Sequence, residues 1–118
     1  MYKAIVFAGT TEGYALCEFL AENRVSVYAC AATEYGGSLL QENEFLHVSA
    51  GRLKTEDMEE LFRKETPEIV LDATHPYAAE VTKNIRAACE NTGVRYQRVL
   101  RPEGEKSETA VYVESTEK

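Results

Sequence analysis

The chain has 118 residues and a formal net charge of −7, with 44% hydrophobic and 28% charged residues. This length and composition are typical of one globular domain with a core of its own. No apolar run approaches the roughly 20 residues that span a membrane, and the N-terminus lacks the apolar segment of a signal peptide, so we expect a cytoplasmic location. The negative charge disfavours nucleic acid or an anionic membrane as the main partner.

The three cysteines indicate neither a disulfide framework nor a metal site. Cys17, Cys30 and Cys89 are odd in number, far apart and without C-x-x-C spacing. We therefore expect buried, reduced thiols and no metal bound by the protein.

The chain begins with an apolar strand at residues 4–8, which runs straight into a small hydroxyl loop and then an amphipathic helix at residues 11–23. The loop reads Gly9-Thr10-Thr11-Glu12-Gly13. Because the N–H groups at a helix start bind phosphate, this order of elements predicts nucleotide or dinucleotide binding.

The loop departs from both common phosphate-binding patterns. Its glycines are spaced G-x-x-x-G, whereas the dinucleotide fingerprint is G-x-G-x-x-G. Tyr14-Ala15 follows the last glycine, where a P-loop has Lys and Ser or Thr, which argues against a nucleoside-triphosphate hydrolase. The plainer alternative is a strand-to-helix turn in which Thr10 or Thr11 only caps the helix.

Strands and helices alternate along the rest of the chain. The expected strands are residues 25–31, 45–49, 69–72 and 96–100. Three further helices are expected. A short one covers residues 38–42, after a break at Gly36-Gly37. The next is capped by Thr55 and stops before Pro67, and the last begins at Thr74-His75-Pro76 and ends at Gly93. This alternation predicts an α/β fold, a Rossmann-like doubly wound parallel sheet of about five strands with helices on both faces.

The last residues have a different composition. Residues 103–107 are polar and acidic, typical of a linker, and residues 109–113 predict one more strand. That strand either starts a second domain or lies at the edge of the first, and we favour the first alternative. The expected organisation is a nucleotide-binding lobe at residues 1–102, followed at residues 103–118 by a linker and the start of a second lobe.

Ligands of such sheets bind beyond the carboxyl ends of the strands, where the strand order reverses. The segments expected there are residues 9–13, 33–34, 73–77 and 98–102.

Three motifs in these segments resemble one family. They read Ala8-Gly9-Thr10-Thr11-Glu12-Gly13, Asp72-Ala73-Thr74-His75-Pro76-Tyr77-Ala78 and Arg98-Val99-Leu100-Arg101-Pro102. Together they resemble the N-terminal part of the precorrin-6A reductase family of cobalamin biosynthesis, including its cobalt-precorrin form, and the second motif is the specific one. The resemblance covers residues 1 to about 102. Family members continue into a second α/β lobe, so an isolated first lobe is expected to be inactive.

The resemblance implies NADPH-dependent reduction of one double bond in a tetrapyrrole-derived, polycarboxylate macrocycle by hydride transfer. It also implies roles for individual residues. The cofactor phosphates would be bound by Gly9, Thr10, Thr11 and Gly13, in a motif that includes Glu12, and the adenosine ribose by Thr33. The nicotinamide would lie beside Ala73, Thr74 and His75, and the substrate would contact Tyr77, Arg98 and Arg101.

The end of the second strand bears on cofactor choice. NAD-binding folds place a carboxylate there to bind the ribose 2′-hydroxyl, but this chain has none before Glu34. The sequence therefore favours NADPH over NADH. Arg52 is the nearest candidate for the 2′-phosphate, and the alternative is an ordinary surface arginine.

Several site residues have competing interpretations. Glu12 would repel a phosphate by about 1 kcal/mol or more, so it must point away or accept bonds from N–H or hydroxyl groups. His75 is a candidate proton donor, or the Thr-His-Pro turn only shapes a helix start. Asp72 is expected to bond to the turn that follows it. Arg98 and Arg101 suit substrate carboxylates, or they pair with surface glutamates.

Two other function classes stay open. One is a non-catalytic module that senses NADP(H). The other is a flavodoxin-like FMN-binding or receiver-type domain. A receiver would need acidic residues after the first strand, which are absent, and a flavodoxin would have only Tyr35 and Tyr77 to stack on a flavin.

Overall fold

The computed structural model describes residues 2–75, 77–100 and 112–114. Its strands are β1 (Ala4–Ala8), β2 (Val27–Ala31), β3 (Leu46–Ala50), β4 (Ile69–Ala73), β5 (Tyr96–Leu100) and β6 (Tyr112–Glu114). Its helices are α1 (Thr11–Glu22), α2 (Glu34–Ser38), α3 (Thr55–Glu65) and α4 (Ala79–Thr92). None of the helices in this part of the chain has the length and apolar character needed to traverse a bilayer.

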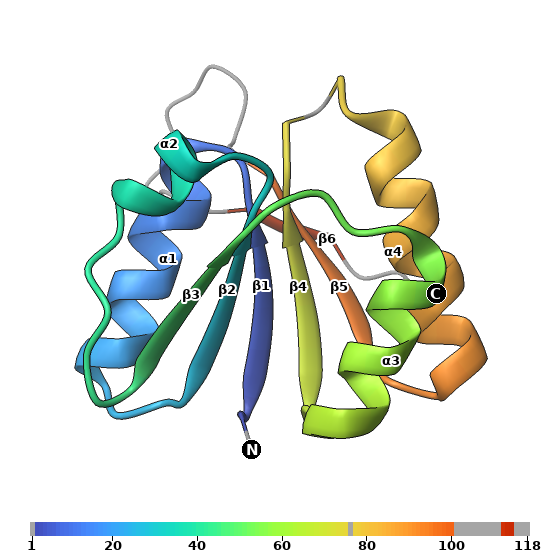
Figure 1. Ribbon diagram of the computed structural model, residues 1–118, viewed down its shortest axis with the longest axis horizontal. Coiled ribbons are helices and arrows are strands. Elements are labelled where there is room, and N and C mark those ends of the chain that lie inside the picture. The colour runs from blue at the N-terminus through green and yellow to red at the C-terminus, as the bar shows by residue number, and fades with distance from the viewer. Residues whose placement is uncertain (1, 76, 101–111, 115–118) are drawn as a thin grey trace.

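The strands form one sheet in the order β3-β2-β1-β4-β5-β6 (Figure 1). The first five strands are parallel, which confirms the predicted doubly wound α/β sheet. The chain moves outward from β1 to β3 and then returns to β4 on the other side of β1, so the strand order reverses between β1 and β4. Ala8 pairs with both Ala31 and Ala73. The ends of β1, β2 and β4 are thus level, and we call this end of the sheet the carboxyl edge.

Every residue of β1 is buried, which shows that both faces of the sheet are covered at its centre. Val6 and Ala8 belong to a cluster with Cys17 and Ala21 of α1. Ile5 and Phe7 belong to a second cluster, which α3 and α4 complete with Met58, Phe62 and Ile85. Figure 1 shows the pairs α1 with α2 and α3 with α4 on either side of the reversal point.

The short helix α2 corrects one prediction. It covers residues 34–38 rather than 38–42, so Gly36 and Gly37 lie inside a helix instead of breaking the chain. Both glycines are buried; a Cβ at Gly36 would lie 2.7 Å from the Tyr14 hydroxyl, and one at Gly37 would lie 3.3 Å from Ala50 Cβ. Close packing against α1 and β3 therefore outweighs the weak helix propensity of glycine.

The starts of α3 and α4 also differ from expectation. Thr55 is the first residue of α3 rather than its cap, and the Lys54 N–H donates to Asp57 Oδ2 at 3.0 Å. Helix α4 begins at Ala79, so Thr74 and His75 lie in a loop and not at a helix start. Gly93 ends α4 in the left-handed conformation, with φ of 79°, as predicted. Pro76 lies outside the described residues.

Strand β6 pairs antiparallel with β5, with Arg98 opposite Glu114. Residues 112–114 thus form an edge strand of the same sheet, which is the alternative that we favoured less. The start of the expected strand at residues 109–111 and the expected linker at residues 103–107 lie outside the described residues. The domain boundary near residue 102 stays a prediction.

Candidate active site

The loop between β1 and α1 is bonded to the end of β4. The Thr10 hydroxyl donates to the Ala73 carbonyl oxygen at 2.9 Å, and the Gly9 N–H reaches the same oxygen at 3.3 Å. The Thr10 Oγ1 atom also accepts from the Gly13 N–H at 3.1 Å and so caps α1. The proton of the Thr10 hydroxyl is therefore used in a hydrogen bond within the protein. Thr10 caps the helix, as the plainer alternative for this loop predicted. Thr11, the first helical residue, is exposed at the carboxyl edge.

The two loop glycines have different surroundings. Gly13 is buried, and a Cβ there would lie 3.0 Å from Ala73 Cβ and 3.1 Å from Ala8 Cα. This glycine brings the helix start close to the sheet, as the last glycine of a dinucleotide fingerprint does. Gly9 is exposed, and its Cβ would make only ordinary contact, 3.4 Å from Thr74 Cα. The backbone of residues 74–75 lies directly beside Gly9.

Asp72 is fully buried near the end of β4 and accepts five hydrogen bonds. Its Oδ1 atom accepts from the N–H and the hydroxyl of Thr74, at 3.1 and 2.7 Å, and from Arg98 Nη1 at 3.0 Å. Its Oδ2 atom accepts from the hydroxyls of Thr82 and Tyr96, both at 2.8 Å. The expected bond from Asp72 to the turn that follows it is confirmed.

The partners of Asp72 join β4 to α4 and β5. Arg98 Nη1 also lies 3.1 Å from the Asp72 carbonyl oxygen, and the Arg98 side chain is only 12% exposed. Burial, together with the Asp72 carboxylate, raises the pKa of Tyr96, so its hydroxyl stays a hydrogen-bond donor. Arg86 of α4 lies over the Tyr96 ring, 5.1 Å from its centroid. Arg98 was expected at the substrate, whereas its guanidinium lies against the Asp72 carboxylate in the structure.

Thr82 and Tyr96 were not predicted as members of this cluster. A carboxylate within an apolar strand signals them, because a buried charge needs donors from neighbouring elements. Tyr96 and Arg98 are two positions apart in β5, so both side chains lie on the same face of the sheet as Asp72.

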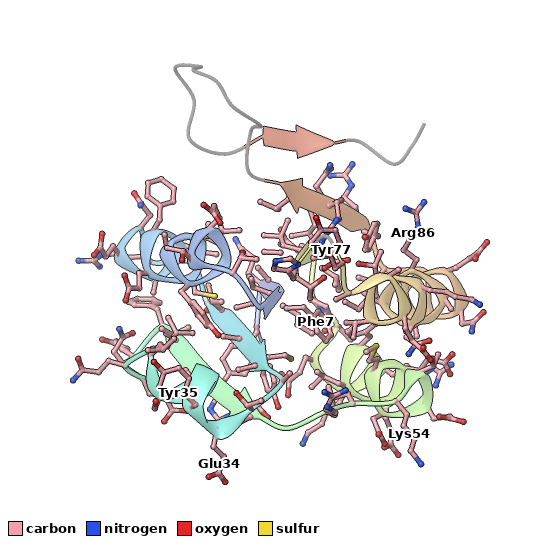
Figure 2. The ribbon with its side chains drawn as sticks, turned by 90° about the horizontal axis from the view of Figure 1, so that it is seen from above. Phe7, Glu34, Tyr35, Lys54, Tyr77 and Arg86 are labelled. Carbon is pink, nitrogen blue, oxygen red and sulfur yellow. The ribbon has the colours of Figure 1, made fainter. Side chains whose placement is uncertain are left out.

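The loop after β4 carries His75 and Tyr77 at the carboxyl edge, and both side chains are exposed. Figure 2 shows Tyr77 in the view from above. The Tyr77 N–H donates to His75 Nδ1 at 3.1 Å, and the Ala78 N–H donates to the His75 carbonyl oxygen at 2.9 Å. The two rings lie 5.0 Å apart, and Tyr77 is 89% exposed.

The remaining predicted residues spread along the same edge. Thr33 follows β2 and caps α2, accepting from the Gly36 N–H at 3.0 Å. Arg52 is exposed after β3, the strand farthest from the reversal point on that side. Glu12 is half-buried in the first turn of α1. Arg101 lies outside the described residues.

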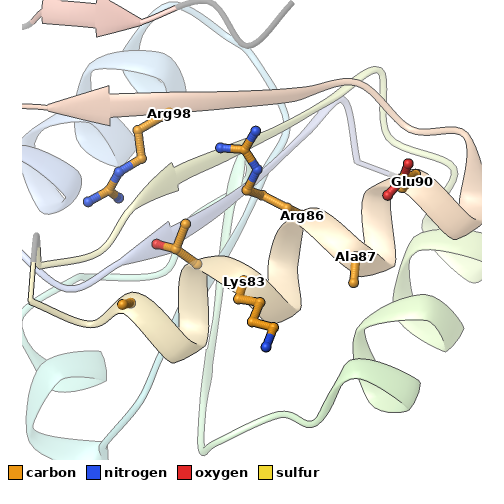
Figure 3. A pocket seen from close by; sticks show the side chains of 7 residues that line it. Lys83, Arg86, Ala87, Glu90 and Arg98 are labelled. Carbon is orange, nitrogen blue, oxygen red and sulfur yellow. The ribbon is translucent and has the colours of Figure 1, made fainter.

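A shallow groove runs between α4 and β5 (Figure 3). Its volume is about 520 Å³, and it is lined by Ala79, Thr82, Lys83, Arg86, Ala87, Glu90 and Arg98. Lys83, Arg86 and Arg98 line this groove together with one carboxylate, Glu90, and the charge of Arg98 is already paired with that of Asp72. Within the described ranges, no group of three or more His, Cys, Asp or Glu side chains is placed to hold a metal ion.

Comparison with known proteins decides the family. The family model described as "Precorrin-6x reductase CbiJ/CobK" matches residues 3–118. The chain belongs to this family. The resemblance inferred from the three motifs is thereby confirmed.

Two curated relatives show the extent of the match. The cobalt-precorrin-6A reductase of Methanothermobacter thermautotrophicus is 37% identical over 102 residues, which cover 86% of this chain and 34% of that protein. The Salmonella typhimurium protein of the same name is 35% identical over 99 residues, covering 84% of this chain and 37% of that protein. The chain thus spans a little over one third of the length of these relatives.

Solved structures agree with the fold. A chain described as "CobK precorrin-6A reductase" matches with a TM-score of 0.74 and 28% identity, over 92% of this chain and 42% of that one. The enzyme WbmH of Bordetella bronchiseptica, solved in complex with NAD+, matches with a TM-score of 0.61 and 20% identity, over 81% of this chain and 37% of that one. The second likeness concerns the fold alone.

Proposed function

We propose that this chain is the cofactor-holding part of a reductase that adds hydride from NADPH to one double bond of precorrin-6A or cobalt-precorrin-6A. The observation that carries the proposal is the junction of the β1–α1 and β4–α4 loops at the reversal point, through Thr10 Oγ1 and the Ala73 carbonyl oxygen at 2.9 Å, in a chain of this family. This is the place where doubly wound sheets bind dinucleotides.

The residues at this junction suit a dinucleotide. The close approach of α1 at Gly13 and the exposed Gly9 leave the helix start open at the carboxyl edge, where its backbone N–H groups attract a pyrophosphate. In this proposal the exposed Thr11 and the backbone N–H groups of Thr10 and Thr11 hold the phosphates. Gly9 and Gly13, whose N–H groups are bonded within the protein, shape the loop together with the Thr10 hydroxyl. Ala73 and Thr74 border the nicotinamide, and NADPH supplies the hydride when bound.

The choice of NADPH over NADH rests on the end of β2. Ala31 ends the strand, and Ala32 and Thr33 follow it without a carboxylate. A ribose 2′-phosphate would therefore meet no repulsion before Glu34, which is exposed in α2. We assign Thr33 to the ribose and Arg52 to the 2′-phosphate. A cytoplasmic location is part of the same proposal.

The substrate side of the proposal uses Tyr77, Arg98 and Arg101. A polycarboxylate macrocycle needs cations, and the groove between α4 and β5 adds Lys83 and Arg86 to Arg98. Tyr77 offers an exposed ring at the same edge. His75 stands beside Gly9, where it borders the nicotinamide; as a proton donor it would have to protonate Nδ1 and lose the bond from the Tyr77 N–H.

Titration of the chain with nucleotides, followed by fluorescence, tests the proposal. NADPH should bind more tightly than NADH, and FMN should not bind. Thr11→Asp should weaken NADPH binding at least tenfold, because it adds a carboxylate at the proposed phosphate site while suiting the positive end of the helix dipole. Thr55→Asp, the same change at the first residue of α3, is the matched control and should leave binding unchanged.

The same titration addresses the two other function classes. Tight FMN binding would favour the flavodoxin-like alternative and overturn the reductase assignment. NADPH binding without reductase activity after addition of the second lobe would favour a sensing module. The chain alone is expected to be inactive, since it spans about one third of the curated relatives.

A further inference from the structure

His75 is fixed by its own loop. Its Nδ1 atom accepts from the Tyr77 N–H at 3.1 Å, its carbonyl oxygen accepts from the Ala78 N–H at 2.9 Å, and its ring lies against that of Tyr77. The preceding residue, Thr74, is held by the buried Asp72 carboxylate through both its N–H and its hydroxyl. The imidazole is therefore attached to a loop that is bonded on both sides.

The bond at Nδ1 determines where the imidazole proton lies. An Nδ1 atom that accepts a hydrogen bond carries no proton, so a neutral ring of this kind has its proton on Nε2. The imidazole then has one N–H to offer, at Nε2. The backbone of His75 lies beside Gly9, since a Cβ at Gly9 would stand 3.6 Å from the His75 nitrogen.

We propose that His75 is a fixed hydrogen-bond donor whose Nε2–H binds an acceptor oxygen of the dinucleotide held by residues 9–13. This inference rests on the proposed function for its ligand, but the tautomer that it requires does not. Two groups of the ligand are the candidates for this bond, the pyrophosphate through one of its oxygens and the nicotinamide through its carboxamide oxygen. In this role His75 gives up no proton, and its loop keeps the bond from the Tyr77 N–H to Nδ1.

The tautomer is measured first, without ligand, from the NMR chemical shifts of the imidazole nitrogens and protons. The chain is produced without a histidine tag, so that no other imidazoles contribute. The chain has only two histidines, and the second is an internal control. His47 Nδ1 lies 3.1 Å from Glu42 Oε2, so this nitrogen carries a proton. At neutral pH we expect His75 to be protonated on Nε2 alone and His47 to be protonated on Nδ1. A proton on Nδ1 of His75 would overturn the proposal.

Two substitutions separate the donor from a merely structural residue. His75→Asn keeps an acceptor near Nδ1 for the Tyr77 N–H but removes the Nε2 donor, whereas His75→Gln keeps a donor near Nε2. We expect His75→Asn to weaken NADPH binding about tenfold, the usual effect of one lost hydrogen bond, and His75→Gln to stay within about threefold of the parent. The opposite order would show that only the loop bond matters and would overturn the proposal.

Three ligands identify the oxygen. The effect of His75→Asn should vanish with 2′,5′-ADP, which lacks both the pyrophosphate and the nicotinamide. Persistence with 2′-phospho-ADP-ribose assigns the pyrophosphate oxygen, and loss with that ligand assigns the carboxamide oxygen. An equal effect with 2′,5′-ADP would overturn the proposal. Failure of the parent chain to bind any of the three ligands would overturn the cofactor assignment and the ligand of His75, while the tautomer is judged by its own measurement.

Discussion

Gly9 lies in the loop after β1 and Gly13 in the first turn of α1, and only Gly13 has no room for a side chain. A Cβ at Gly13 would lie within 3.1 Å of both Ala73 Cβ and Ala8 Cα, atoms of the sheet that cannot move aside easily. Gly13→Ala should therefore lower the free energy of unfolding by about 1–3 kcal/mol through overpacking. Urea denaturation measures this. Gly9→Ala, whose Cβ would make ordinary contacts, is the matched control and should change stability by less than about 1 kcal/mol.

The Asp72–Arg98 pair is the second prediction at this scale. Asp72→Asn should destabilise the chain by about 3–5 kcal/mol, because it leaves the Arg98 guanidinium, only 12% exposed, without its counter-charge. Arg98→Met added to Asp72→Asn should cost much less than the sum of the two single changes. A double-mutant cycle in urea measures this coupling.

A surface pair provides the comparison for that cycle. Arg63 lies 3.8 Å from Glu59, and its side chain is 61% exposed. Arg63→Met should therefore change stability by no more than about 1 kcal/mol. If Asp72→Asn and Arg63→Met lowered the free energy of unfolding equally, the stabilising role that we assign to the buried Asp72–Arg98 pair would be contradicted.

The elements of this fold were predictable where one short-range signal dominates. Strand β1 is apolar throughout, and Gly93 stops α4 in a conformation that suits glycine. Helix α2 and the start of α4 were mispredicted because long-range contacts decide them. Gly36 is helical because it packs under Tyr14, and Thr74 is kept out of α4 by its bonds to the buried Asp72.

The site followed the same division. Residues 9–13 and 73–75 could be placed at one edge, because the ends of parallel strands meet there and both motifs follow strands. That the Thr10 hydroxyl would bond to Ala73 and Arg98 to Asp72 could not be derived, since each bond joins residues far apart in the chain. Strand β6 likewise depends on a long-range pairing with β5.

Thr10 connects the first loop to β4, and its replacement tests that connection. Thr10→Val keeps the shape but removes both the cap of α1 and the bond to the Ala73 carbonyl oxygen. We expect a loss of about 1–2 kcal/mol in the free energy of unfolding, and a near-normal value for Thr10→Ser. The same change at Thr33, which caps the five-residue α2, should cost less. A loss for Thr33→Val that equals or exceeds the loss for Thr10→Val would count against the role of Thr10.

For the whole molecule, buried thiols make stability depend on alkaline pH. Burial raises the pKa of Cys17 and Cys89 from an ordinary value near 9 to about 12, and also raises that of Cys30. Because the unfolded chain loses these protons first, the stability present below pH 9 should fall as the pH rises toward 12. Between pH 8 and 10 we expect the free energy of unfolding to fall by about 1 kcal/mol per thiol, measured by urea denaturation at each pH.

A variant with one thiol fewer tests that origin. Cys17→Ala should show a shallower decline over the same pH range than the parent chain. An equal slope in both proteins would assign the decline to other groups, among them Tyr96, whose pKa burial also raises.

The whole arrangement places the loops after β1 and β4 side by side at the carboxyl edge, with the cationic groove between α4 and β5 beside them (Figures 1 and 3). The central claim is that NADPH binds at this edge. Backbone amide shifts of the isotope-labelled chain, followed during titration with NADPH, test it most directly. We predict saturable changes centred on residues 9–13 and 73–75. Changes centred on the opposite end of the sheet, or none at millimolar NADPH, would contradict the account.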